Sequence, residues 1–180
     1  MKSWNCSRTL PLSTVKIYNN PKFTGFEIEI PTLKRLSQIS NINYYKDASG
    51  NTGRLLQLSN VVGNDLKIFS ASAHVPVFVM MLGGAGWMAG PACLLPRESV
   101  MLYELCEKKH WDEAFRLQKI MWEVNRVFQK YNLAACVKAG LQFQGFSVGN
   151  PIPPNQPLAT DAQKEVAQVI GRIQKEFHTS

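Results

Sequence analysis

The stretch that decides the fold is INYYKDASGN, Ile42–Asn51. An apolar and aromatic run with high strand propensity ends at Lys46, and a turn of small residues follows it directly. A helical pattern then begins at Asn51 or Thr52, both suited to cap a helix, and it ends at Gly63. This order predicts one strand–helix unit that places a lysine at the tip of its strand.

Three further runs of the same kind surround this unit. The predicted strands are residues 13–18, 42–46, 66–70 and 86–89, and their tips are Tyr18, Lys46, Ser70 and Ala89. Helical patterns at residues 31–40, 51–63 and 75–82 lie between the strands, which favours a parallel sheet because parallel neighbours need crossover connections. The spacing fits four consecutive units of a (β/α) barrel, and it also fits a doubly wound sheet.

The second half of the chain changes to helices without further strands. Amphipathic patterns cover residues 96–110, 111–131, 132–145 and 160–177, with a proline-rich loop at 147–160. The longest pattern has one apolar face, formed by Ala114, Leu117, Ile120, Met121, Val124 and Val127 or Phe128. We therefore predict an atypical N-terminal segment at 1–13, (β/α) units at 14–95 and a helical region at 96–180.

Composition narrows the functional class. Hydrophobic residues make up 45% of the chain and charged residues 18%, which suits a folded domain with a real core. The net charge of +7 is spread along the chain instead of clustering with exposed aromatics, so we expect no nucleic-acid partner. An anionic small substrate fits the sign of the charge equally well.

The uncharged stretch at residues 75–95 is long enough to span a bilayer, but five residues interrupt it: Gly83, Gly84, Gly86, Gly90 and Pro91. We expect a short helix, a glycine turn and a strand there, not a membrane span. The N-terminus lacks the long apolar run of a secretory signal, which favours a cytoplasmic protein.

Cysteine, histidine and glycine patterns give no specific site. The four cysteines (Cys6, Cys93, Cys106 and Cys136) form no CxxC pair and the three histidines are dispersed, so we expect buried free thiols and no metal. Ser70 and Ser72 precede His74 without the GxSxG pattern of a nucleophile elbow. GGAGWMAG at 83–90 lacks a phosphate-loop lysine and GxGxxG spacing, which favours backbone packing.

The pair Tyr18 and Lys46 carries the strongest chemical signal. In barrels the catalytic groups come from the C-terminal ends of the strands. A lysine amine that is partly shielded from water loses its proton more readily and can attack a keto carbonyl to form a Schiff base. A nearby tyrosine hydroxyl can shuttle protons. Residue type alone favours a solvated lysine and a packing tyrosine, whereas the pairing of the two at strand tips favours catalysis, so both interpretations stay open on this pattern.

Four motifs occur in a specific order: YNNPKFTG at 18–25, YKDASGN at 45–51, GGAGWMAGPACLLPRE at 83–98 and CVKAGLQFQGFSVGNPIPPNQPL at 136–158. Together they resemble the dihydrodipicolinate synthase/N-acetylneuraminate lyase family over about residues 14–178. The resemblance implies a (β/α)8 TIM barrel with added C-terminal helices, typically a homo-oligomer. It also implies Schiff-base lyase chemistry on pyruvate-like or 2-keto acid substrates, with no metal or organic cofactor.

The resemblance also implies roles for individual residues. Lys46 is the imine-forming lysine and Tyr18 the proton-shuttling tyrosine. Ser70 and Ala71 occupy the strand tip that lines the substrate pocket, and Met88 occupies the position whose backbone faces the lysine.

The turn after Tyr18 distinguishes branches of the family. Its NNP form is similar to the branches of keto-sugar-acid aldolases and dehydratases. Phe23 stands where the synthase branch has an arginine that holds a dicarboxylate. The resemblance therefore argues against dihydrodipicolinate synthesis.

The resemblance begins at the fifth strand of the family barrel, so we expect a partial barrel of strands 5–8. The small Thr/Ser motif that binds the substrate carboxylate in the family is absent from the sequence, as is the tyrosine that its subunits exchange. We interpret the start of the chain as an alternative start, a truncated gene or a disrupted reading frame. Such a half barrel has two exposed strand edges, and its inner face is in contact with water. Pairing with a second copy or with an N-terminal piece could close the sheet.

Two hypotheses follow from these patterns. The first is an active Schiff-base lyase of the aldolase or dehydratase type. The second is a truncated, inactive family remnant that folds only by association with itself or a partner.

Overall fold

The computed structural model describes residues 13–71, 75–88 and 90–178. Four strands form one parallel sheet in chain order: β1 (Val15–Asn19), β2 (Ile42–Asp47), β3 (Lys67–Ser70) and β4 (Gly86–Trp87). The predicted parallel sheet is thus confirmed. The last strand is shorter than the predicted 86–89, and Ala89 lies outside the described residues.

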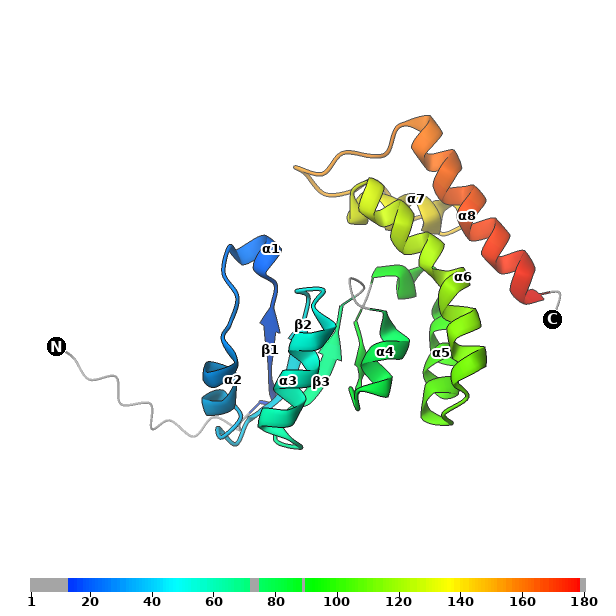
Figure 1. Cartoon of the computed structure of the whole chain (residues 1–180). Coiled ribbons are helices and arrows are strands. Elements are labelled where there is room, and N and C mark those ends of the chain that lie inside the picture. The colour runs from blue at the N-terminus through cyan, green and yellow to red at the C-terminus, as the bar shows by residue number, and fades with distance from the viewer. Residues whose placement is uncertain (1–12, 72–74, 89, 179–180) are drawn as a thin grey trace.

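The crossover connections run through α2 (Ile30–Leu36), α3 (Thr52–Val62) and α4 (Pro76–Met81), which cover one face of the sheet (Figure 1). The side chain of Asn51 caps α3 by accepting a hydrogen bond from the Arg54 N–H. The segment after β1, predicted as a turn, contains the one-turn helix α1 (Pro21–Thr24), which Gly25 ends in the left-handed region at φ 74°.

The helix-covered face of the sheet forms the first hydrophobic core. Ile17, Tyr45 and Ile68 alternate with side chains of the opposite face, as the two-residue period of a strand requires. They pack against Leu33, Leu55, Leu58, Val62, Leu66 and Val79. Tyr45 is fully buried in this core. The two-residue period therefore fixes which side chains of each strand remain for the other face.

The opposite face of the sheet is open in the part of the chain that the structure describes. Strand register places Tyr18, Lys46, Phe69 and Gly86 in one row on this face, and Lys16, Tyr44 and Lys67 in the row below. Tyr18 keeps 47% of its surface accessible and Met88 38%. We call these two rows with Met88 the open face.

The helical region packs beside the sheet as a second core. It contains α5 (Pro96–Glu107), α6 (Trp111–Lys130), α7 (Leu133–Phe143) and α8 (Thr160–His178), joined to β4 by the 3₁₀-helix η1 (Gly90–Cys93). The predicted apolar face of α6 is buried apart from Ile120, which is half-buried. This core extends from Val77 on α4 to Ile173 on α8, so it crosses the predicted boundary at residue 95, which stays a prediction.

The predicted cysteine environments hold in part. Cys106 and Cys136 are buried free thiols, and burial raises the pKa of each to about 11. Cys93 is exposed, which corrects the expectation of burial, because η1 lies at the surface of the second core. Cys6 lies outside the described residues.

The glycine-rich stretch after α4 serves backbone packing, as predicted. A Cβ atom at Gly84 would lie 2.5 Å from Val79 Cγ1, so the turn can approach α4 this closely only without a side chain. Among the helices that the structure describes, none combines the length and apolar character needed to cross a membrane.

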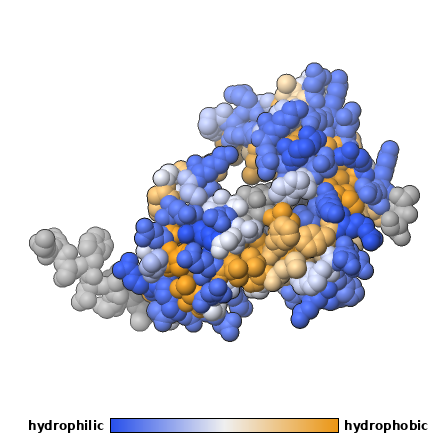
Figure 2. All heavy atoms as spheres, in the orientation of Figure 1, coloured by the Kyte–Doolittle hydropathy of each residue, from blue (hydrophilic) through white to orange (hydrophobic). Residues whose placement is uncertain are grey.

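The outer surface of the helix layer carries hydrophobic side chains. Figure 2 shows them gathered over α3 and α4 in the orientation of Figure 1. Leu56, Val61, Phe78 and Met81 are all exposed there. This surface points away from the sheet and from the open face.

Candidate active site

Lys46 and Tyr18 meet at the tips of adjacent parallel strands. Their Cα atoms are paired in the β1–β2 register, so both side chains project from the open face. Lys46 Nζ lies 4.1 Å from the centroid of the Tyr18 ring, a cation–π contact. The structure therefore brings together the two residues that the sequence singles out, and their catalytic roles remain predictions.

Asn20 orients the Tyr18 hydroxyl. The Asn20 Nδ2–H donates a hydrogen bond of 2.9 Å to Tyr18 Oη. This contact uses a lone pair of the phenol oxygen, so the hydroxyl hydrogen can still be donated to another group. Sequence analysis did not single out Asn20, although it stands in the same turn motif two residues after the tyrosine.

A second amine lies on the same face. Lys16 Nζ lies 2.6 Å from Met88 Sδ and 5.9 Å from the centroid of the Phe69 ring. Phe69 pairs with Lys46 in the β2–β3 register. Lys16 therefore reaches from the lower row toward the row that holds Tyr18 and Lys46.

Ser70, Ala71 and Met88 occupy different positions around this pair. Ser70 pairs with Asp47, so its fully buried side chain points to the helix-covered side, away from Lys46. The Ala71 N–H donates to Asp47 O at 2.8 Å, and the Met88 N–H donates to Ser70 O at 2.8 Å. The Met88 side chain lies on the open face, where its Sδ contacts Lys16 Nζ. The predicted roles of these three residues in lining a substrate pocket stay predictions, while Ser72 and His74 lie outside the described residues.

A buried polar group lies directly behind Tyr18 and Lys46. Asn19 and Asp47, 1% and 0% exposed, follow Tyr18 and Lys46 in the chain and point to the opposite side of the sheet. Asn19 Nδ2 donates to Asp47 Oδ1 at 3.2 Å. Burial and the neighbouring Asp47 carboxylate together raise the pKa of the Tyr45 hydroxyl above its ordinary value.

Arg54 is the cation of this buried group. Its Nε lies 3.6 Å from Asp47 Oδ2 and 3.4 Å from Glu27 Oε1, and only 10% of its side chain is exposed. Sequence reasoning missed Asn19, Asp47 and Arg54. The available signal was strand alternation, because a charged residue directly after Lys46 has to lie on the face that α3 covers.

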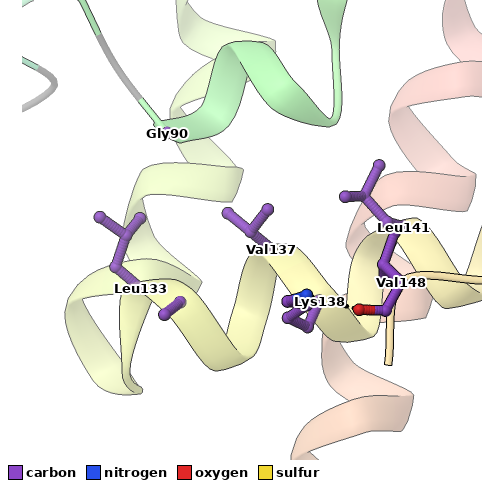
Figure 3. Close-up of a pocket in the computed structure, with 7 residues that line it drawn as sticks. Gly90, Leu133, Val137, Lys138, Leu141 and Val148 are labelled. Carbon is purple, nitrogen blue, oxygen red and sulfur yellow. Dashed lines mark hydrogen bonds between the residues drawn. The ribbon is translucent and has the colours of Figure 1, made fainter. Parts of the chain in front are cut away.

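A separate cavity of about 350 Å³ lies in the helical region (Figure 3). Leu133, Val137 and Leu141 extend from the same side of α7 into its wall, with Gly90 and Val148 nearby. The ammonium of Lys138, also in the lining, donates to the Val148 carbonyl. None of the predicted site residues lines this cavity, so it is distinct from the Lys46 site.

The open face offers an amine, a phenol and further cations for chemistry. Within residues 13–71, 75–88 and 90–178, no three His, Cys, Asp or Glu side chains gather as a metal site would require. An amine beside a phenol suits carbonyl chemistry by covalent catalysis with proton transfer.

The sequence model of the Dihydrodipicolinate synthetase family matches residues 9–173. The chain belongs to the dihydrodipicolinate synthetase family. This confirms the resemblance based on the tyrosine and lysine motifs. The chain is similar to the 4-hydroxy-tetrahydrodipicolinate synthase of Prochlorococcus marinus (strain NATL2A), with 28% identity over 169 residues, which are 94% of this chain and 55% of the relative.

Another relative also matches most of this chain and about half of its own length. The synthase of Caldicellulosiruptor saccharolyticus is 32% identical over 149 residues, which are 82% of this chain and 49% of the relative. The chain spans about half the length of the curated relatives it matches.

Solved structures of the dihydrodipicolinate synthetase family share the fold. The 4-hydroxy-tetrahydrodipicolinate synthase of Methylacidiphilum fumariolicum SolV superposes with a TM-score of 0.85 at 23% identity, over 92% of this chain and 56% of that one. A Sulfolobus 2-keto-3-deoxygluconate aldolase gives 0.78 at 24% identity, over 92% and 56%. The four-stranded sheet and the C-terminal helices therefore match about half of such a TIM-barrel protein.

Proposed function

We propose that this chain carries the Schiff-base chemistry of an aldolase or dehydratase acting on pyruvate-like or 2-keto acids. In this proposal Lys46 is the imine-forming amine and Tyr18 the proton shuttle. The observation that supports it most is the placement of the Lys46 ammonium 4.1 Å from the Tyr18 ring centroid at neighbouring strand tips. We further propose that β1–β4 correspond to strands 5–8 of the family barrel.

The proposed reaction begins with the neutral amine of Lys46. Its nitrogen lone pair attacks the keto carbon, and the carbonyl π electrons move to oxygen, which takes up a proton through Tyr18. The resulting carbinolamine loses water after a further proton transfer, which leaves a protonated imine between Lys46 and the substrate. The imine withdraws electrons from the neighbouring carbon, so a C–H or C–C bond there can break with its electron pair kept in an enamine. The enamine can then expel a protonated hydroxyl group as water from the next carbon.

The charge of the open face supports an anionic substrate. Lys16 and Lys67 share this face with Lys46, and the described strand positions of the two rows hold no carboxylate. Phe23, at the position where the synthase branch has arginine, is 84% exposed on α1 and offers no charge. We therefore propose that Lys16, on the sheet itself, helps to hold the substrate carboxylate.

Deuterium exchange at the methyl group of pyruvate tests both roles. In D₂O, imine formation followed by enamine formation replaces methyl hydrogens by deuterium, which proton NMR follows directly. We expect exchange with the unmodified chain, none with Lys46→Met, and slower exchange with Tyr18→Phe. A folded sample that produces no exchange above the protein-free rate contradicts the proposal.

A second candidate is a truncated, inactive family remnant that folds only by association with itself or a partner. The exposure of Tyr18 and Met88 on the open face favours it, because barrel-lining side chains normally pack in layers. Exposed Leu56, Phe78 and Met81 on the outer helices offer a further surface for a homo-oligomer. Light scattering measures the assembly state, and the exchange rate is measured at the same protein concentrations. The second candidate predicts a chain that assembles and gives no exchange at any of these concentrations.

A further inference from the structure

The residues that directly follow Tyr18 and Lys46 form a buried pair on the other side of the sheet. We propose that Asn19 and Asp47 are positioning residues, whose contact fixes the two strand tips so that Lys46 and Tyr18 stay side by side. This inference rests on the proposed function for its catalytic consequence. Its structural part can be tested without any activity.

The contacts of Asp47 join two strands and the turn after them. Its Oδ1 accepts hydrogen bonds from Asn19 Nδ2 at 3.2 Å and from the Ser49 N–H at 2.6 Å. The Ala48 N–H donates to Asn19 O at 2.8 Å, which ties the same two tips through the backbone. The Asp47 carboxylate therefore lies where β1, β2 and the turn after Lys46 converge.

Asn19 extends the connection to the segment before α2. Its Oδ1 accepts from the Ile28 N–H at 3.1 Å, while the guanidinium of Arg54 on α3 donates to the Ile28 carbonyl. The side-chain amide of Asn19 thus donates to Asp47 on β2 and accepts from Ile28 in the segment before α2. Its side-chain oxygen and nitrogen are both used, so its orientation is fixed.

Stability alone does not account for this group. The Arg54 Nε and Asp47 Oδ2 atoms form an ion pair at 3.6 Å, too far for a good hydrogen bond, and neither buried atom has a hydrogen-bond partner among the described residues. Removing two charges from water in this way is costly, and apolar residues of similar size often give equal or greater stability. Buried polar groups with incomplete contacts call for another explanation, and their place behind the reactive pair supplies one.

Geometry explains how the pair would act. Neighbouring residues of a strand share one backbone, so a shift of Asp47 or Asn19 moves Lys46 or Tyr18 by a similar distance. Misplacement of a reacting group by about 1 Å can lower a rate by roughly a hundredfold. We therefore expect loss of the Asn19–Asp47 contact to reduce turnover more than substrate affinity.

The test compares Asp47→Asn and Asn19→Ala with Glu27→Gln, a control that removes the more exposed carboxylate beside the same Arg54. For pyruvate deuterium exchange we expect the first two variants to lower kcat by about tenfold to a hundredfold, with KM changed less than about threefold. Glu27→Gln should keep both values. The double variant Asn19→Asp with Asp47→Asn, which exchanges the two partners, should recover part of the lost kcat.

Amide hydrogen exchange of the protein gives a readout that does not depend on activity. The amides of Ala48 and Ala71 donate to Asn19 O and Asp47 O. In Asp47→Asn and Asn19→Ala we expect these two amides to exchange faster while the core of α6 keeps its protection. Unchanged protection together with unchanged kcat overturns the inference, and so does an equal loss of protection throughout the chain, since that marks a purely structural role.

The outcomes also separate this inference from the proposed function. If the unmodified chain shows no deuterium exchange into pyruvate, the proposed function fails. The amides of Ala48 and Ala71 then still decide the positioning claim: faster exchange in Asp47→Asn supports it, and unchanged exchange overturns it.

Discussion

The two faces of the sheet differ in what covers them and in what they carry. One face packs Ile17, Tyr45 and Ile68 under helices in a closed apolar core. The other face is open in the described part of the chain and carries Lys16, Lys46 and Lys67 with aromatic neighbours. Both faces come from the same short strands, so Ile17, Tyr45 and Ile68 each have a neighbour in the chain that lies on the open face.

This difference separates stability from chemistry along each strand. The helix-covered face packs the strands against helices, and the open face presents the proposed reactive groups in rows set by the strand register. The buried Asn19–Asp47 contact lies on the helix-covered face at the strand tips, next in the chain to Tyr18 and Lys46. Changes on one face should therefore alter stability, and changes on the other should alter reactivity.

The largest expected effect is a loss of stability, and it is tested by comparing two adjacent tyrosines on opposite faces of the sheet. Tyr45 is fully buried, whereas Tyr44 is half-buried on the open face with its ring 6.0 Å from that of Phe69. Tyr45→Ala should lower the free energy of unfolding by about 3–5 kcal/mol, and Tyr44→Ala by roughly 1 kcal/mol. Urea unfolding followed by circular dichroism measures both.

The control for this comparison is Tyr45→Phe. Among the residues that the structure describes, none forms a hydrogen bond with the Tyr45 hydroxyl, so its removal should change stability by less than about 1 kcal/mol. Equal losses for Tyr44→Ala and Tyr45→Ala would show that the open face is packed as firmly as the core, contrary to our description.

A smaller effect is expected from the charge of the open face. Lys16→Met should raise the pyruvate concentration for half-maximal deuterium exchange about threefold to tenfold, or roughly 0.7–1.4 kcal/mol, by removing a cation near the site. Lys22→Met removes an exposed lysine from α1 and serves as the matched control. An equal response of both variants would mean that net charge alone matters.

The smallest effect lies far from both faces, in the helical region. Glu165 accepts contacts from Lys130 Nζ at 2.6 Å, Tyr131 Oη at 2.7 Å and Arg126 at 3.2 Å, and these hold its pKa at about 2. A carboxylate with a lowered pKa stabilises the fold fully above its ordinary value of 4.5, and loses that contribution as the pH falls toward 2.

Melting temperatures of Glu165→Gln and the unmodified chain between pH 7 and pH 3 test this expectation. The difference between them should shrink as the pH falls, while pyruvate exchange at neutral pH stays the same. A difference that does not vary with pH would show that the charge of Glu165 is not the cause.

Much of the fold could be predicted because its signals are local. Strand runs that end in small-residue turns, the Asn51 cap and the periodic face of α6 all lie within short windows. The position of the Lys46–Tyr18 pair followed from the rule that parallel strand tips share one edge. The extent of β4 was less predictable, because it makes few strand contacts of its own.

The buried group behind the site could not be predicted with the same ease. Asn19, Asp47 and Arg54 come from three separate segments, and only register and helix packing bring them together. The direction of the Ser70 side chain depends on pairing in the same way, since one residue of register decides the face. Residues whose role depends on pairing across strands leave a weak signal in a single sequence.

Trapping with pyruvate and borohydride tests the central claim most directly. Reduction fixes an imine as a stable adduct, and peptide mass mapping shows which lysine carries it. We predict an adduct on Lys46 and none on Lys16 or Lys67 of the same face, with no adduct in Lys46→Met. A folded chain that gives no adduct at millimolar pyruvate, or that labels the three lysines equally, would contradict the account.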